Sequence, residues 1–176
     1  STFSGNLADL QGGGVYNGGT LSMTNSTFSG NSAGYQGGGV YNGGTLHLAN
    51  TLVANSSSGG DCFNIDAIDL NANNLVEDGN CSPALSGDPQ LAPLGDYGGP
   101  TPTFALLPGS PAIDAGASCP AVDQRGVTRP VGAACDLGAF ESQGFTLAKT
   151  GGDQQHAVIH SAFAQPLTVT VSSGFT

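Results

Sequence analysis

Five charged side chains in the second half of the chain have the types and spacing that could form a reactive site: Asp114, Asp123, Arg125, Arg129 and Asp136. Two carboxylates held about 5 to 10 Å apart across a sugar-binding groove could cleave a glycosidic bond. An arginine can instead hold a carboxylate through two hydrogen bonds, and two of the three basic residues fall in this group. We interpret the group as a structural ion-pair cluster and predict neither catalytic residues nor an enzyme. Glycan cleavage is the alternative.

The four cysteines form two pairs of sequence neighbours, Cys62 with Cys81 and Cys119 with Cys135. Their spacing lacks a CxxC motif and the histidines are scattered, which favours disulfides over a redox or metal site. Three connectivities are open, and we expect the local one because each pair brackets one loop-rich segment. Each bridge closes a short loop, worth about 3 kcal/mol in the chain-entropy model. Structural disulfides indicate an oxidising, extracellular setting.

A calcium site is the alternative to a chain without cofactors. Oxygen-rich loops bind hard cations, but the acidic residues around the first cysteine pair match neither the EF-hand spacing nor the glycine-aspartate nonapeptide repeat. We therefore predict no metal or cofactor. The acidic residues in question are Asp61, Asp66, Asp69, Glu77 and Asp78.

Charge is scarce and one-sided, with 13 acidic residues against three basic ones and a formal net charge of -10. This balance excludes a nucleic-acid surface. No apolar run approaches the roughly 18 to 20 residues of a membrane-spanning helix, so we expect no membrane insertion in this segment. No signal peptide is recognisable at the N-terminus, and the chain starts inside a repeat. We therefore expect a fragment or a processed product of a longer protein.

A sequence repeat indicates the structural elements that position these groups. Residues 11–21 recur without change as residues 36–46, and residues 1–6 recur as residues 26–31, both at an offset of 25. A fainter third copy starts at Thr51. A fixed period in the twenties, rich in Gly, Asn, Ser and Thr, is typical of stacked units that bury their apolar faces against their neighbours. We therefore predict an all-β fold in which these units are rungs of a parallel β-helix.

Alternation of apolar and polar residues places strands within each rung. Residues 20–24 and 45–49 alternate with a period of two, so Leu21 and Met23 are expected to point inward. Glycine clusters mark the corners between about three faces. The repeated Asn-Gly pairs could instead form the turns of antiparallel hairpins. Identity at a 25-residue offset favours stacked units in which the chain returns to the same faces.

Stacking at one offset brings like residues above like, and we expect three ladders along the stack. In-register aromatic rings can stack, and asparagine side chains can hydrogen-bond along the axis. The expected pairs are Tyr16 over Tyr41, Phe3 over Phe28, and Asn25 over Asn50.

The composition and the repeat pattern change twice along the chain, which predicts three regions. Residues 1–58 carry the 25-residue period, residues 59–142 hold all cysteines and form a loop-rich C-terminal cap, and residues 143–176 form a short β extension. In the extension Leu167, Val169 and Val171 alternate with threonines. A few strands cannot close a sandwich alone, so we expect them to be completed by further sequence or by strand addition to another chain.

Seven motifs between residues 74 and 141 resemble those of bacterial surface proteins that combine right-handed parallel β-helix repeats with a choice-of-anchor Q domain. The resemblance covers residues 1–141, and the tail from Phe145 looks like the start of a bacterial Ig-like domain. Relative to a full family member we expect upstream repeats, the rest of the Ig-like domain and an anchor to lie outside this sequence. The motifs are residues 74–78, 87–91, 98–101, 109–116, 123–126, 129–130 and 135–141.

The resemblance implies a right-handed, pectin-lyase-like solenoid and an exported, surface-linked architectural protein without defined catalytic machinery; the right-handed crossover rule favours the same hand. We accordingly predict an extracellular structural or adhesive protein that presents a rigid rod. We expect it to self-associate into filaments, end to end or by strand addition. The alternative is a β-helix protein that binds or cleaves polysaccharide, with surface glycans as partners.

Overall fold

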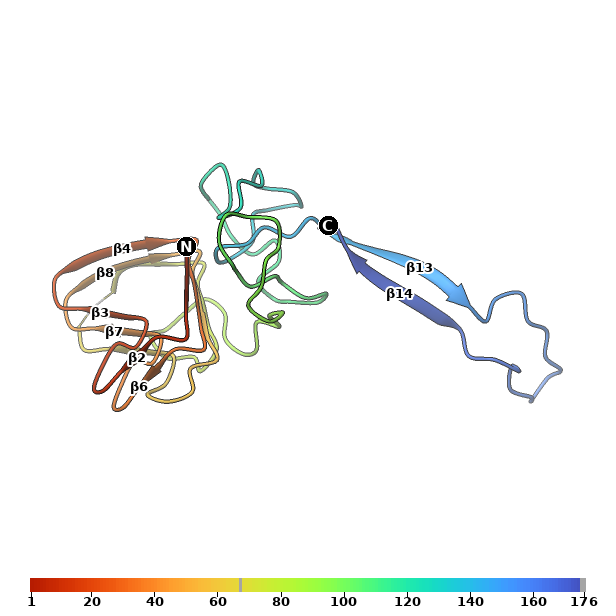
Figure 1. The fold of residues 1–176 in the computed structure, drawn as a ribbon, viewed down its shortest axis with the longest axis horizontal. Coiled ribbons are helices and arrows are strands. Elements are labelled where there is room, and N and C mark those ends of the chain that lie inside the picture. Colours follow the sequence, from red (N-terminus) through yellow and green to blue (C-terminus); the bar gives the residue numbers. More distant parts are fainter. Residues whose placement is uncertain (67, 175–176) are drawn as a thin grey trace. The chain divides into compact units, whose positions relative to one another are not determined.

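The computed structural model describes residues 1–66 and 68–174 (Figure 1). All regular secondary structure in these residues is β-strand, which confirms the all-β prediction. The chain divides into two compact units, Ser1–Ser142 and Gln143–Thr176. Positions 175 and 176 of the expected extension lie outside the described residues.

The described residues of the first unit form four sheets in which every pairing is parallel. The four-stranded sheet consists of β1 (Thr2–Ser4), β5 (Thr27–Ser29), β9 (Leu52–Ala54) and β12 (Leu75–Val76). The two three-stranded sheets consist of β3 (Val15–Asn17), β7 (Val40–Asn42) and β10 (Cys62–Asn64), and of β4 (Thr20–Thr24), β8 (Thr45–Ala49) and β11 (Ile68–Ala72). A short pair joins β2 (Leu7–Ala8) to β6 (Ser32–Ala33).

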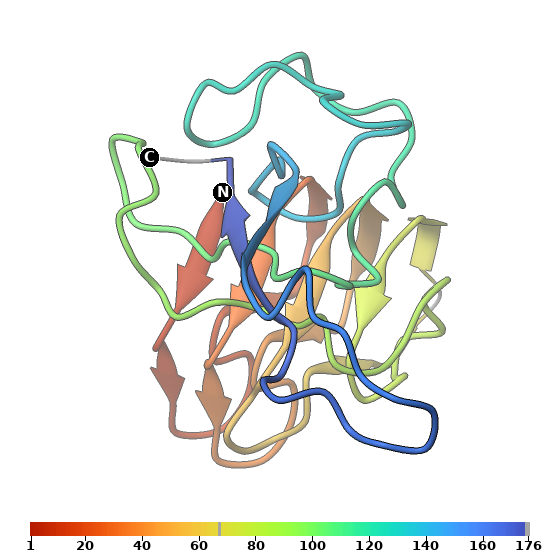
Figure 2. The same ribbon diagram turned by 90° about the vertical axis from the view of Figure 1, so that its right-hand side faces the viewer.

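The pairing follows the sequence repeat. Phe3 lies beside Phe28 and Leu21 beside Leu46, so residues 25 apart are neighbours. The same parallel pairing continues past residue 58 as far as Val76, which lies beside Val53. We call residues 1–76 the stacked passes, because three passes of the chain lie one above the next. Figures 1 and 2 show them as red to yellow strands side by side.

The core of the stacked passes is a continuous apolar row. Leu46 and Leu48 are fully buried, while His47 between them is half-exposed, as expected for a strand with one inward face. Phe28, Val40 and Val53 from the other sheets complete the cluster. Burial of this row stabilises the fold by about 25 cal/mol per Å² of apolar surface removed from water.

Two of the three expected ladders are present as ring stacks. The rings of Phe3 and Phe28 have centroids 4.5 Å apart, and those of Tyr16 and Tyr41 are 5.1 Å apart. Phe63 extends the second stack, with its centroid 5.5 Å from that of Tyr41. Stacked aromatic pairs contribute beyond their buried area.

The third expected ladder differs from the prediction. Asn25 and Asn50 occupy equivalent corner positions with φ of 44° and 49°, a conformation that asparagine tolerates. Their side-chain amides bond to residues 117–138 rather than to each other, because main-chain groups of that segment lie against this corner. An asparagine ladder does occur elsewhere, in β3, β7 and β10.

That asparagine ladder joins Asn17, Asn42 and Asn64. Asn17 Nδ2 donates to Asn42 Oδ1 and Asn42 Nδ2 donates to Asn64 Oδ1, both at 2.6 Å. Asn42 also donates to the carbonyl of Gly44 at the corner. Because Asn42 is fully buried, these bonds satisfy polar groups that would otherwise destabilise the fold.

Residues 77–142, which we call the loop module, have almost no regular structure. Isolated bridges pair Leu91 with Leu106 and Val122 with Thr128. The loop module buries several apolar residues of its own, including Leu106, Leu137 and Phe140. In Figure 1 the green and teal loops lie to one side of the red to yellow strands.

The second unit is an antiparallel hairpin of β13 (Phe145–Gly151) and β14 (Thr168–Ser173). Leu147 lies beside Val171, and Lys149 lies beside Val169. Leu167 precedes β14. All three residues of the expected strand-addition segment are exposed, Leu167 at 66%, Val169 at 56% and Val171 at 48%.

Replacing Asn42 with leucine should lower the free energy of unfolding by about 2 to 4 kcal/mol, because Asn17 loses a buried acceptor and Asn64 a donor. Urea denaturation followed by circular dichroism measures the change. Asn6→Leu is the matched control at the exposed end of a second asparagine contact, with an expected loss below about 1 kcal/mol. Equal losses for the two variants would contradict a stabilising role for the buried ladder.

Candidate functional site

The corner of the stacked passes that carries Asn25 and Asn50 is bound by the loop module. Asn25 Nδ2 donates to the carbonyls of Asp136 at 3.1 Å and Gly138 at 3.3 Å. Asn50 makes a two-bond contact with Ala117, donating to its carbonyl at 2.7 Å and accepting its N–H at 3.1 Å. Groups that are separated by 67 to 113 positions in the sequence thus meet at one corner.

The contact extends along the four-stranded sheet. Ala139 N–H donates to Thr27 Oγ1 at 2.9 Å, and Gly138 N–H donates to the Asn50 carbonyl at 2.8 Å. Gly138 has a φ of 83°, and a Cβ there would lie 2.5 Å from Thr27 Oγ1. Glycine is therefore required for this close approach.

Two arginine–carboxylate pairs lie directly behind this contact. Arg125 pairs with Asp123 and Arg129 pairs with Glu141, each with an N–O distance of 2.8 Å and side chains no more than 2% exposed. The Arg125 guanidinium also lies 3.6 Å above the centre of the Phe140 ring. Charges this deeply buried persist only when paired and hydrogen-bonded.

Arg129 joins the cluster to the contact corner. Its Nη1 donates to the Asp136 carbonyl at 2.7 Å and to Glu141 Oε2 at 2.8 Å, and its Nη2 donates to the Gly138 carbonyl at 2.8 Å. Arg129 and Asn25 therefore bind the same two carbonyls. Burial lowers the pKa of Arg129 and the nearby Glu141 raises it.

The carboxylate of Asp123 is fully engaged. It accepts the N–H of Arg125, Val127 and Glu141 and the Nε of Arg125, at 2.7 to 3.0 Å. These four bonds use about all the lone-pair positions of a carboxylate. The side chain of Asp123 therefore serves to hold the main chain and Arg125 in place.

Asp136 and Asp114 have different roles from those expected. Asp136 Oδ1 accepts the Asp114 N–H at 2.8 Å and its Oδ2 accepts the Ser142 N–H at 2.5 Å. Burial raises the pKa of Asp136 to about 6. Asp114 is exposed and accepts the Ala134 N–H. In the part of the chain that the structure describes, neither aspartate forms an ion pair with an arginine, because their oxygens fix main-chain turns instead.

Glu141 is the member that sequence reasoning missed. It pairs with Arg129, accepts the N–H of Val131 and Asp136, and is fully buried. The one available signal was its place directly after Ala139 and Phe140, since an acidic residue in an apolar run must find partners on burial.

Disulfides join Cys62 to Cys81 and Cys119 to Cys135, with Cα–Cα distances of 5.9 and 6.4 Å. All four cysteines are paired with their sequence neighbours. Cys62 lies in β10 and contributes to the apolar core. Cys135 begins the segment that carries Asp136, Gly138 and Ala139, so the second disulfide restrains the contact corner.

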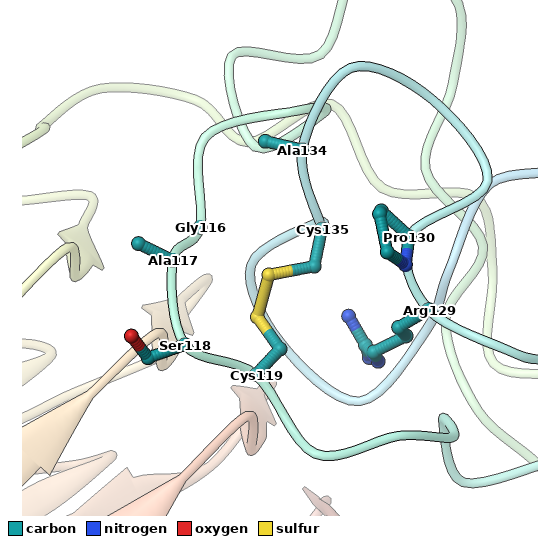
Figure 3. Close-up of a pocket in the computed structure, with 8 residues that line it drawn as sticks. All are labelled: Gly116, Ala117, Ser118, Cys119, Arg129, Pro130, Ala134 and Cys135. Atoms are coloured by element: carbon teal, nitrogen blue, oxygen red, sulfur yellow. A yellow bond between two sulfur atoms is a disulfide. The ribbon is translucent and has the colours of Figure 1, made fainter.

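A pocket of about 340 Å³ lies beside the second disulfide (Figure 3). The disulfide forms one wall, and Arg129 and Pro130 lie together on one side of it. Arg129 Nε is buried and has no hydrogen-bond partner. Main chain, small side chains and bonded sulfurs make up the remaining lining, in which Ser118 carries the one hydroxyl and no carboxylate or histidine is present. The lining residues are Gly116, Ala117, Ser118, Cys119, Arg129, Pro130, Ala134 and Cys135.

The acidic residues near the first disulfide also serve the main chain. Asp61 N–H donates to Asp78 Oδ2 at 2.8 Å, and Asp78 N–H donates to Asp61 Oδ2 at 3.2 Å. Glu77 accepts the Asn55 N–H. Burial is the main cause that raises the pKa of Asp61, with the nearby Asp78 a smaller one. These carboxylates close the turns that surround a pocket of about 390 Å³.

The other acidic residues considered for calcium lie apart from that pocket. Asp69 lies 3.7 Å from His47 Nε2 at the surface, and the Asp66 carbonyl accepts a bond from Asn64. In residues 1–66 and 68–174, no group of three or more His, Cys, Asp or Glu side chains is placed to hold a metal ion.

Comparisons with known proteins add no relative to these observations. A scan against family models found no matching family, and searches of curated proteins and of solved structures found no match either. Within the described ranges no helix has the length and apolar character needed to cross a bilayer.

Replacing Arg129 with lysine should lower the free energy of unfolding by about 3 kcal/mol or more. A lysine ammonium group lacks the planar guanidinium with which Arg129 binds the Asp136 carbonyl, the Gly138 carbonyl and Glu141 at once. Glu141 would then remain buried without its partner. Thermal and urea unfolding measure the loss. Asp69→Asn, which breaks the exposed contact with His47, is the control and should cost less than about 1 kcal/mol. A loss for Arg129→Lys no larger than the control would contradict the assigned role.

Proposed function

We propose that the stacked passes form a right-handed parallel β-helix. The regular parallel register and the inward apolar row support this architecture. The handedness rests on the general preference for right-handed crossovers between parallel strands. On this proposal the loop module is the disulfide-stapled C-terminal module of the helix and residues 143–176 are a partial Ig-like extension.

The function that the site supports best is structural. We propose an extracellular architectural or adhesive protein of the bacterial surface type that carries a choice-of-anchor Q domain, presenting a rigid rod. The observation that carries the proposal is that Asp123, Glu141 and Arg129 are buried and bind main-chain groups, with Glu141 also paired to Arg129, so that these side chains hold the loop module together. Two disulfides agree with an oxidising location.

A polysaccharide-active protein is the competing function. The pocket of about 340 Å³ could hold one sugar residue. Cleavage would need two carboxylates facing each other across it, and Arg129 is the one charged side chain in its lining. The structural proposal is therefore favoured.

The purified chain should release no reducing ends from a panel of plant and bacterial polysaccharides. The reason is that Asp123 has no free lone pair and Asp114 no paired acid. A reducing-sugar assay measures release, with a glycan array to detect binding without cleavage. Release that is abolished by Asp114→Asn or Asp123→Asn in a folded variant would replace the structural proposal with an enzyme.

We propose further that copies of the chain associate by strand addition along β14. Leu167, Val169 and Val171 are exposed, and a two-stranded hairpin is marginal alone. Residues 143–176 carry one lysine and one aspartate, so the net charge of -10 resides in the first unit. Two hairpins can therefore pair without charge repulsion between them.

Light scattering of the full chain should show a mass that rises with protein concentration. The double variant Val169→Lys, Val171→Lys should remain monomeric, since charges on an edge strand oppose strand addition. The matched control is Val158→Lys, Ile159→Lys, which changes exposed residues outside the strands and should still associate. A wild-type mass that stays monomeric at all concentrations would sink this proposal.

A further inference from the structure

The buried cluster of the loop module holds three carboxylates and two guanidinium groups. Asp123 pairs with Arg125 and Glu141 pairs with Arg129. Asp136 is the third carboxylate, is 2% exposed, and accepts two main-chain N–H groups. The side chains of the cluster therefore carry one surplus negative charge when all are ionised. A buried unpaired carboxylate is costly, and a single proton removes that cost.

Charged groups of both signs face Asp136, but burial has a larger effect on its pKa than they have. Glu141 repels its charge and Arg129 attracts it, while the donated N–H groups of Ser142 and Asp114 favour the ionised form. From the stacked passes the neighbouring group is the neutral amide of Asn25. The remaining charged groups around the cluster are Asp123, Arg125, the exposed carboxylate of Asp114, and the amino group of Ser1, which faces Arg129 and Asp123.

The same carboxylate fixes the segment that binds the stacked passes. Residues 135–142, which we call the clasp segment, supply the carbonyls of Asp136 and Gly138 to Asn25 and the N–H of Ala139 to Thr27. The Asp136 side chain ties this segment to Ser142 at its end and to Asp114 in the facing loop. A change of charge on Asp136 therefore acts directly on the contact.

We propose that the clasp segment is a pH-sensitive contact between the loop module and the stacked passes. It binds one proton on Asp136 and holds more tightly when that carboxyl is neutral. It loosens when the carboxylate is ionised and leaves the surplus charge buried. The proposal concerns regulation of the fold and does not depend on the strand addition or the surface role proposed above.

The direction of the effect follows from the pKa of Asp136, which is about 6 in the folded chain against an ordinary value of 3.8. Between these values the folded chain binds a proton that the unfolded chain lacks, so the free energy of unfolding falls as pH rises from about 4 to about 6.5, then levels off. The pKa difference corresponds to roughly a hundredfold change in the unfolding equilibrium constant.

The first measurement is a carbon-13 NMR titration of the Asp136 carboxyl in the wild-type full chain. A midpoint near 6 is expected, and a midpoint at or below about 4 would overturn the proposal. This readout needs no variant, so a failure of any mutant to fold does not affect it. Hydrogen exchange at the Ala139 amide, corrected for intrinsic rates, should show weaker protection at pH 8 than at pH 5; equal protection would also overturn the proposal.

The second measurement is urea unfolding between pH 4.5 and 8. The folded-to-unfolded ratio of the wild type should fall roughly thirtyfold between pH 4.5 and pH 8, and Asp136→Asn should remove most of that dependence. Asp9→Asn is the matched control, because it deletes one exposed negative charge of the stacked passes and should keep the dependence. A pH dependence retained in Asp136→Asn, or lost in both variants, would assign the effect to general charge repulsion.

Discussion

The first unit depends on one constraint, which is that equivalent main-chain groups of successive passes must hydrogen-bond directly above each other. At the glycine corner, Gly14 N–H donates to the Gly38 carbonyl at 2.9 Å and Gly39 N–H donates to the Asp61 carbonyl at 3.1 Å. A Cβ on Gly39 would lie 2.4 Å from Val53 Cγ1. Any side chain there would separate the passes, so the repeated glycines are a condition for the parallel register.

That register also decides where the loop module can bind. Placing Asn25 above Asn50, both with positive φ, puts two amides at one corner. The clasp segment accepts hydrogen bonds from the Asn25 amide, and Gly138 permits the approach. Ala117 binds the Asn50 amide. The position of the buried charged cluster is therefore a consequence of the repeat, since Arg129 binds the carbonyls that Asn25 also binds.

The sequence was sufficient for the stacking of repeated strands and rings, and insufficient for hydrogen bonds that depend on the loops. Identical residues at one offset predicted the all-β class and the ring stacks of Phe3 and Tyr16. The Asn17 ladder was missed because its third member, Asn64, follows Asn42 by 22 residues and lies outside the identity. The choice of Glu141 for Arg129 depends on the path of the loops, because other carboxylates lie close in sequence.

The loop module buries several charged side chains although their burial is costly. The lack of regular structure in this module explains why. A buried ion pair is often no better for stability than apolar residues of the same shape. Apolar residues, however, cannot satisfy main-chain groups, and in this segment no β-ladder is available to do so. Arg129 binds two carbonyls, and Glu141 binds two N–H groups. Charged side chains thus take the place of secondary structure, and the surplus carboxylate of Asp136 arises because its two N–H partners also need an acceptor.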